Sequence, residues 1–355
     1  MIREIDQAYS FFSRISADVG GPLEWAWGTL MSRGNINSLF FSDMLAGELA
    51  SLVQSIPLEA PVISAYPVHA QIAARAGFQK VINLVPDNYP QYFVLAPGAL
   101  NLLQGPAAYG RFRDMGVPAK DLEVAGHWVS ESLATNAGAD SEARIKRAEN
   151  KQPRRVLLPI GGAGAQKKYV LELLGLIKEE LKRGDLYLFL NTGDHEHVYS
   201  AIKKYLGSEN ISHESVTTWS GLKDFCGKHD LTAGEPDFTP AVTLFHFDSH
   251  FAAFAATDLL MRVSDVLATK PSELAFFPIP KLFLRRVGDH EAQSALRSEE
   301  LGEGTVECRE PARAAAYLNL LCKEKDLFVQ MNENVADAAG RGIYDGAKQA
   351  VELTK

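Results

Sequence analysis

Short apolar runs alternate along the chain with stretches of helical spacing. The candidate strands of the first half are 61–66, 80–85, 92–95, 99–103 and 121–129, and the candidate helices are 45–56, 68–76 and 107–115. Strands that alternate with helices predict a parallel, doubly wound sheet. In such a sheet, ligands bind at the carboxyl ends of the strands.

The same alternation begins again at a glycine cluster near the middle of the chain. The apolar run that ends at Ile160 is followed by Gly161-Gly162-Ala163-Gly164, and helical spacing then extends from Lys167 to Lys182. Glycines let a backbone approach a ligand, and the start of a helix favours an anion. The order of glycines fits neither the dinucleotide fingerprint nor the phosphate loop, so a phosphate-holding loop and a plain strand-to-helix turn both stay open.

Further strands and helices follow this cluster. The candidate strands are 185–195 with a polar turn at its end, 211–217, 241–247, 263–268 and 281–285, and the candidate helices are 197–206 and 251–261. This pattern predicts a second doubly wound domain.

The length of 355 residues is too great for one ordinary α/β core and suits two domains. After Ser130 the composition shifts to small and charged residues, and Glu142 to Arg155 carries six Lys and Arg side chains. We therefore predict a first domain over 1–140, a linker over 141–155, a second domain over 156–331 and a C-terminal helix over 332–355.

Composition narrows the class of protein. A hydrophobic content of 46% is ordinary for a globular protein, and a net charge of -8 without a basic run argues against nucleic acid as a partner. The three cysteines form no C-x-x-C pair and suit free thiols in a reducing compartment. No apolar stretch reaches the roughly 20 residues of a membrane span. We expect a cytoplasmic protein that is soluble or peripheral at a membrane.

Two N-terminal segments are rich in large apolar side chains. They are Pro22 to Met31 and Leu39 to Leu45, both with helical spacing. Core packing or a helical lid is one interpretation. The other is an apolar entrance for a lipid acceptor or a contact with a membrane surface.

Candidate acid–base groups follow two strands of the first half. His69 comes after the strand at 61–66, and Asp87 comes after the strand at 80–85. A carboxylate and an imidazole at neighbouring strand ends can serve as a general base and its orienting partner. Alternatively, His69 caps a helix and Asp87 starts a turn.

Hydroxyl-binding candidates lie at strand ends of the second half. Glu273, near a helix start, can accept hydrogen bonds from a ribose diol, or it can complement the helix dipole. The residues His290, Glu291 and Gln293 can address sugar hydroxyls. The full set of candidate donor-binding residues is Gly161, Gly162, Gly164, Gly193, Lys270, Ser272, Glu273, His290, Glu291 and Gln293.

The cluster His246-Phe247-Asp248-Ser249-His250 contains metal-capable side chains. A metal site needs a third or fourth ligand and a second shell that holds neutral imidazoles. We therefore predict neither a metal nor a cofactor.

The order of motifs resembles the GT-B glycosyltransferases. The similar branch contains the lipid II-forming N-acetylglucosaminyl transferase and the diacylglycerol galactosyl- and glucosyltransferases. The matching segments are Tyr66-Pro67, Pro86-Asp87, Gly116-Val117-Pro118, Val124 to Val129, Leu157 to Gln166, Ser264 to Lys270, Ser272-Glu273 to Pro280, and Gly288 to Ala295. The resemblance implies two Rossmann-like domains facing a cleft. It also implies that the second domain holds a nucleotide sugar, that the first holds the acceptor, and that the last helix crosses back to the first domain.

Two departures from this family stand in the sequence. No Gly-Gly-His loop occurs before Phe11, so the first domain is shortened at its N-terminus, and the turn between Lys270 and Ser272 is short and lacks glycine. The leading hypothesis is inverting transfer of a sugar from a nucleotide diphosphate donor, for which we expect uridine diphosphate, to a lipid or small-molecule acceptor. Asp87 or His69 would act as base, and N–H groups at 161–164 would hold the diphosphate. A catalytically silent nucleotide-sugar sensor or scaffold and a sugar-nucleotide epimerase stay open.

Overall fold

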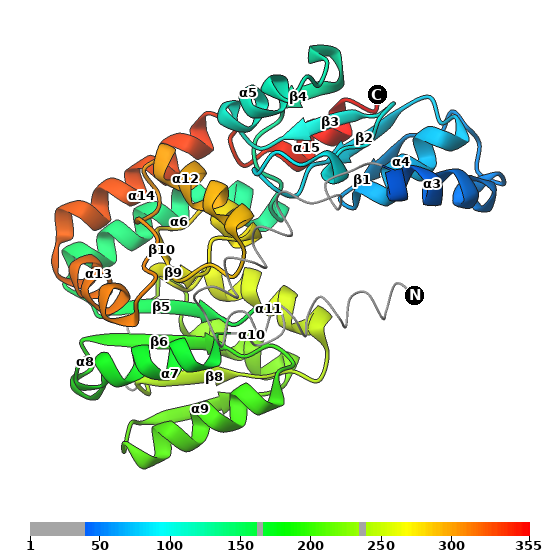
Figure 1. Cartoon of the computed structure of the whole chain (residues 1–355). Coiled ribbons are helices and arrows are strands. Elements are labelled where there is room, and N and C mark those ends of the chain that lie inside the picture. Colours follow the sequence, from blue (N-terminus) through cyan, green and yellow to red (C-terminus); the bar gives the residue numbers. More distant parts are fainter. Residues whose placement is uncertain (1–39, 162–165, 234–238) are drawn as a thin grey trace.

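The computed structural model describes residues 40–161, 166–233 and 239–355, and within these ranges the strands form two parallel sheets (Figure 1). The first sheet has the order β1-β2-β3-β4. Its strands are β1 (Val62–Ser64), β2 (Val81–Leu84), β3 (Leu100–Leu103) and β4 (Leu122–Val124). The helices of this region are α3 (Phe40–Leu49), η2 (Ala50–Val53), α4 (Pro67–Ala76), η3 (Tyr92–Val94), α5 (Pro106–Asp114) and η4 (Ala119–Asp121).

The second sheet has the order β10-β9-β5-β6-β8-β7. Its strands are β5 (Arg154–Pro159), β6 (Leu186–Asn191), β7 (His213–Val216), β8 (Val242–Phe245), β9 (Val266–Thr269) and β10 (Lys281–Phe283). The helices around it are α6 (Glu131–Glu149), α7 (Lys167–Leu176), α8 (Lys178–Arg183), α9 (Glu196–Ser208), α10 (Trp219–Lys228), α11 (His250–Met261), η6 (Glu273–Phe276), η7 (Asp289–Glu291), α12 (Ala292–Glu300), α13 (Pro311–Lys323) and α14 (Lys325–Gly340).

The central strands of the second sheet are buried on both faces, which explains why they are continuous apolar runs. On β5, Val156 and Leu158 belong to the cluster that includes α7, α9 and α13. Leu157, which points to the other face, belongs to the cluster that includes α6, α10 and α11. The alternation along one strand therefore builds the two core layers of the domain.

The predicted strand at 92–95 is instead the short 3-10 turn η3. Side-chain amides bind the carbonyls of this segment, because Asn83 Nδ2 donates to Val94 O at 2.9 Å and Gln71 Nε2 donates to Leu95 O at 2.7 Å. The backbone is thus satisfied without a neighbouring strand. The predicted helix over 167–182 is also divided, at Ile177, into α7 and α8.

The stretch that we predicted as a linker, 141–155, contains the second half of α6 and the start of β5. Its arginines, which suggested a solvated linker, are buried. Arg144 Nε donates to Ser264 O at 2.8 Å, and its Nη2 donates to Met261 O at 3.0 Å. Long cationic side chains can lie inside a domain when they donate to backbone carbonyls. For this reason the run of charges predicted a linker where the structure has the continuation of α6.

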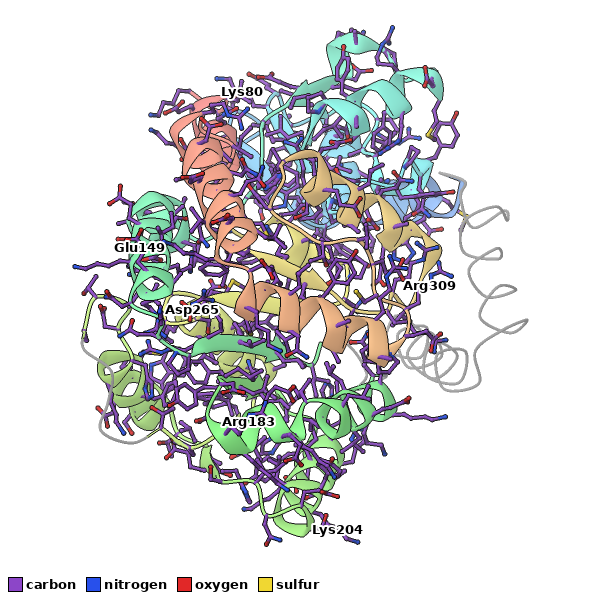
Figure 2. All side chains as sticks on the ribbon, turned by 90° about the vertical axis from the view of Figure 1, so that its left-hand side faces the viewer. Lys80, Glu149, Arg183, Lys204, Asp265 and Arg309 are labelled. Atoms are coloured by element: carbon purple, nitrogen blue, oxygen red, sulfur yellow. The ribbon has the colours of Figure 1, made fainter. Side chains whose placement is uncertain are left out.

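Asp265 is the counter-charge of this buried region and is 0% exposed. Its carboxylate accepts from Arg147 Nε at 3.1 Å and from the backbone N–H of Arg155 at 2.8 Å. The backbone N–H of Asp265 in turn donates to Arg155 O at 2.8 Å. One side chain therefore fixes α6 against the start of β5 and β9 (Figure 2).

The two connections between the domains lie side by side. Trp128, after β4, forms an antiparallel bridge with Asp345, which follows α14. The backbone N–H of Gly346 donates to His127 O at 3.0 Å. A Cβ on Gly346 would lie 2.9 Å from Gly126 O, so only glycine allows this close approach.

Beyond this crossing the chain returns to the first sheet through α15 (Gly346–Glu352), drawn in red in Figure 1. Ala350 packs with Ile82, Leu84 and Leu102. The ammonium of Lys80, labelled in Figure 2, donates to the carbonyls of the last two residues, Thr354 and Lys355, at 3.0 and 2.9 Å. The predicted single helix over 332–355 is divided into α14 and α15 by the turn at Gly342, where φ is +74°.

The side chain of His127 is enclosed at this crossing and is 0% exposed. Arg297 Nε donates to His127 Nε2 at 3.4 Å, so Nδ1 carries the proton and donates to Phe276 O at 2.9 Å. Burial lowers the pKa of His127 from 6.5 to about 3, and the nearby cations Arg297 and Lys281 add to this effect. The ring is therefore neutral at physiological pH.

We expect removal of the Asp265 carboxylate to destabilise the protein. Asp265→Ala leaves Arg147 buried without its counter-charge, which typically costs about 3–5 kcal/mol of unfolding free energy. Urea unfolding measures the loss. The matched control is Asp185→Ala, because Asp185 pairs with Arg183 at 2.7 Å while both side chains are about half exposed. The control is expected to change the unfolding free energy by less than about 0.5 kcal/mol, and equal effects of the two variants would contradict this account.

The buried imidazole predicts a pH dependence of stability. Because the unfolded state binds a proton at His127 below pH about 6.5 and the folded state does so only near 3, folding stability falls as the pH drops through this window. Between pH 7 and pH 5 the loss is about 2 kcal/mol. Urea unfolding of wild type and His127→Gln at both pH values isolates the contribution of His127 to the pH dependence of stability. An identical pH dependence in the two proteins would show that His127 titrates normally.

Candidate functional site

The two domains meet at a carboxylate and an imidazole. Asp87 follows the carboxyl end of β2, and His290 lies in η7, beyond the carboxyl end of β10. The His290 Nε2 and Asp87 Oδ2 atoms are 3.9 Å apart. Both side chains are partly exposed, so a ligand can reach them. The sequence predicted both as site residues but in separate roles, and the structure brings them together across the domain interface.

The other predicted catalytic residue, His69, lies in the first turn of α4. Its backbone N–H donates to Tyr66 O at 3.0 Å, and its ring centroid is 5.2 Å from that of Tyr66. The role of His69 as partner of Asp87 stays a prediction. The imidazole for which the structure shows contact with Asp87 is that of His290.

The loop that carries Asp87 is held at both ends by amide side chains. Gln104 Nε2, beyond the end of β3, donates to Val85 O and Pro86 O at 3.3 Å each. At the far end of the loop, Gln71 and Asn83 donate to the carbonyls of η3. The position of Asp87 is therefore fixed by the first domain itself.

Two predicted donor-binding residues, Lys270 and Glu291, form an ion pair. The other carboxylate oxygen of Glu291 accepts from the backbone N–H groups of Val287 and Gly288 at 2.7 and 3.4 Å. Glu291 is buried. Both oxygens therefore shape the loop after β10, and a contact of Glu291 with sugar hydroxyls stays a prediction.

The remaining predicted donor residues have varied surroundings. Ser272 forms a tight turn, in which its N–H donates to Lys270 O at 2.8 Å. Gln293 Oε1 is buried and has no hydrogen-bond donor among the described residues. Gly193 adopts φ +60°, and its N–H donates to Asn191 Oδ1 at 3.0 Å. Gly161 is exposed.

Three predicted positions fall wholly or partly outside the description. Gly162 and Gly164 lie outside the described residues. Glu273 begins η6, and its side chain lies outside the description as well. Their predicted contacts with diphosphate and ribose stay predictions.

A cavity of about 190 Å³ adjoins the first turn of α7, the loop after β10 and the start of α13. Four cationic side chains line it, Lys168, Arg285, Arg286 and Arg309. Arg309 is labelled in Figure 2. The sequence reasoning missed these residues. The available signal was the pair Arg285-Arg286 directly after a buried strand, which places both at a carboxyl strand end.

The charge of this cavity is only partly compensated. Glu307 accepts from Arg286 Nη1 at 3.0 Å and from its backbone N–H at 3.1 Å, and it lies 3.5 Å from Arg309 Nε. With the lining carboxylates Glu172 and Glu310, three anions face four cations, which leaves a formal charge of +1. In a chain of net charge -8, the lining of this cavity is a local group of cationic side chains. The loop from Arg286 leads within four residues to His290.

The histidines at the ends of β6 and β8 are engaged by the protein. His246 Nε2 is 3.1 Å from Glu196 Oε2, and its ring stacks on Tyr199 with centroids 4.8 Å apart. Within the described ranges, no group of three His, Cys, Asp or Glu side chains is arranged to hold a metal. In the same ranges, no helix has both the length and the apolar character of a membrane span.

The fold is of the GT-B class, with two Rossmann-like domains, as the sequence predicted. Residues 117–355 match the family described as a domain of unknown function, DUF6938, and residues 1–114 match a second domain of unknown function, DUF6937. The chain belongs to the DUF6938 family. No curated protein matches it.

Two solved structures show the likeness in fold. One is the UDP-GlcNAc 2-epimerase from Neisseria meningitidis bound to UDP-GlcNAc, with a TM-score of 0.57 and 12% identity over 89% of this chain and 81% of that chain. The other is S. aureus MnaA in a co-structure with UDP, with a TM-score of 0.52 and 15% identity over 90% of this chain and 84% of that chain. At these identities the likeness concerns the fold.

Proposed function

We propose that this protein is an inverting glycosyltransferase that uses a nucleotide diphosphate sugar, with uridine diphosphate as the nucleotide. The observation that carries the proposal is the meeting of Asp87 and His290, from opposite domains, at a separation of 3.9 Å. The cationic cavity at the first turn of α7 adds a place for the diphosphate. The solved relatives of similar fold support uridine, since their structures hold UDP-GlcNAc and UDP.

In this reaction the Asp87 carboxylate takes the proton of an acceptor hydroxyl. The hydroxyl oxygen forms a bond to the anomeric carbon of the sugar, and the bond from that carbon to the diphosphate oxygen breaks. The diphosphate leaves with the bonding electrons, and Arg285 and Lys168 compensate its negative charge. His290 approaches Asp87 from the opposite domain, so the pair of base and imidazole is complete only when the domains are together.

The acceptor belongs to one of two classes, a lipid or a small soluble molecule. Phe251 and Phe254 on α11 are 75% and 72% exposed, which is unusual for side chains of this size. Their rings favour a lipid acceptor, for which the protein would work in the cytoplasm at a membrane surface. We retain the diacylglycerol and lipid II branch as the proposed relationship within the GT-B class, and we expect nucleic acid to play no part.

A second function, sugar-nucleotide epimerisation, is favoured by the fold of the Neisseria meningitidis enzyme. An epimerase would interconvert isomers of the nucleotide sugar without any acceptor. A silent sensor or scaffold would bind the nucleotide without turnover. Incubation of the protein with UDP-GlcNAc, with and without acceptors, separates the three functions by their products.

We expect uridine diphosphate to raise the melting temperature more than guanosine or thymidine diphosphate does, because a ligand of the native state stabilises it. Replacing Lys168 and Arg285 by alanine should weaken the affinity by about tenfold for each lost charged hydrogen bond. The matched control is Arg313→Ala on α13, because this guanidinium stacks over Tyr317 outside the cavity. Calorimetric titration measures the dissociation constants.

The absence of a thermal shift with every nucleotide, in protein that remains folded, would contradict the proposed function. Equal effects of the cavity variants and of Arg313→Ala would show that the diphosphate does not bind in this cavity. The proposed function would then require a different binding site for the diphosphate.

Asp87→Asn should lower kcat by about 10²- to 10⁴-fold, because an amide cannot accept the hydroxyl proton. The affinity for the nucleotide should stay within about threefold, since the donor lies on the second domain. A comparison of His290→Gln with His69→Gln identifies the orienting partner by kcat. A greater loss in His69→Gln would restore the pairing that the sequence suggested, and full activity of Asp87→Asn would exclude Asp87 as the base.

A further inference from the structure

The imidazole of His127 joins three parts of the molecule that are distant in sequence. Its backbone lies in the crossing of the two interdomain connections, where its carbonyl accepts from Gly346. Its Nδ1–H donates to Phe276 O, the last residue of η6, and its Nε2 accepts from Arg297 on α12. These two segments carry or adjoin the predicted donor-binding residues.

The crossing itself does not need the ring. The backbone bonds of His127 with Ile343 and Gly346 and the bridge from Trp128 to Asp345 hold the two connections together. Both ring nitrogens are instead bonded to the donor segments. The side chain therefore acts on η6 and α12 rather than on the crossing.

Arg297 extends this link to the edge of the first domain. A Cβ on Gly105, which lies beyond the end of β3, would be 2.6 Å from Arg297 Nε. The guanidinium therefore packs directly on the backbone of the first domain, and a side chain at position 105 would displace it. On its other side Arg297 Nε donates to His127. One side-chain pair thus connects the crossing, the donor segments and the first domain.

The surroundings keep this link independent of pH in the physiological range. The charged and titratable groups that face the ring or its partners include Arg297, Lys281, Glu303 and Tyr344, and Arg297 Nη1 also donates to Glu300 Oε2 at 3.4 Å. Lys281 Nζ pairs with Glu303 Oε2 at 2.8 Å, and Glu303 also accepts from the Tyr344 hydroxyl. The cations and the burial hold the pKa of His127 at about 3, so both nitrogens keep the same roles.

We propose that His127 is a positioning residue that ties η6 and α12 to the interdomain crossing, so that the donor segments take their binding arrangement only when the two domains are closed. The binding part of this inference rests on the proposed function. By linkage, a nucleotide that binds these segments stabilises the closed state to the same extent that closure strengthens nucleotide binding.

Two variants test the two hydrogen bonds of the imidazole separately. His127→Asn places an amide donor near the position of Nδ1 and loses the acceptor for Arg297, whereas His127→Gln reaches toward Arg297 and loses the donor to Phe276. The matched control is Tyr344→Phe, which removes the bond to Glu303 and has its ring centroid 5.7 Å from that of His127. Tyr344 is as buried as His127 but is bonded to neither donor segment.

Interdomain distance is the readout that needs no ligand. Spin labels at Lys120→Cys on the first domain and Lys204→Cys on the second use exposed positions. The native thiols interfere little, because burial raises the pKa values of Cys226, Cys308 and Cys322 to about 12, 11 and 12. We expect both His127 variants to broaden the distance distribution and to shift it to longer distances. Tyr344→Phe should lower only the melting temperature.

Nucleotide affinity is the second readout. Both His127 variants should bind uridine diphosphate at least about tenfold more weakly, and saturating nucleotide should restore the wild-type distance distribution. If wild type binds no nucleotide, the proposed function fails, and the distance measurement still decides whether His127 holds the domains closed. Variants of His127 that lower the melting temperature but leave the distance distribution as in wild type would overturn the inference. If they change the distances but leave the nucleotide affinity as in wild type, the link to the donor segments is overturned.

Discussion

The arrangement of this molecule depends on one buried carboxylate, that of Asp265. A charge with 0% exposure is stable only with a counter-charge and hydrogen-bond donors, and Asp265 has both in Arg147 and the backbone of Arg155. This pair fixes α6 to the amino end of the second sheet. Because α6 follows the connection from the first domain, and α14 packs along it on the way back, the placement of both connections depends on the same ion pair.

The strands of the second domain could be predicted because burial on both faces makes them continuous apolar runs. Helix α6 could not, because much of its buried face is polar. Asp140, Ser141, Arg144 and Arg147 are all buried, at the three- and four-residue spacing that usually marks an apolar stripe. The charges of this stretch favoured a linker, whereas their spacing is that of one face of a helix. The strand prediction for 92–95 was wrong for another reason, because the carbonyls of this segment accept hydrogen bonds from side chains that lie far away in the sequence.

The candidate site, too, could be predicted from the sequence only in part. The rule that ligands bind at carboxyl strand ends selected Asp87, Lys270 and His290 as site residues, and the structure places Asp87 and His290 3.9 Å apart. It could not show that Lys270 pairs with Glu291 or that His290 approaches Asp87, because these contacts depend on three-dimensional packing. The sequence did not predict the cationic cavity, because Arg285 was assigned only as the end of the strand at 281–285 and Arg286 was given no role. Lys168 and Arg309 join them only through packing of α7 beside α13.

The two halves of the site are prepared in different ways. In the first domain, amide side chains from α4, β2 and the end of β3 clamp the loop of Asp87 at both ends, so the position of the base needs no ligand. In the second domain, η6 and α12 are bonded to His127 at the crossing, and Arg297 touches the first domain only when the domains are together. A rigid loop on one side and hinge-bonded segments on the other imply that domain closure, rather than the ordering of a loop, assembles the site.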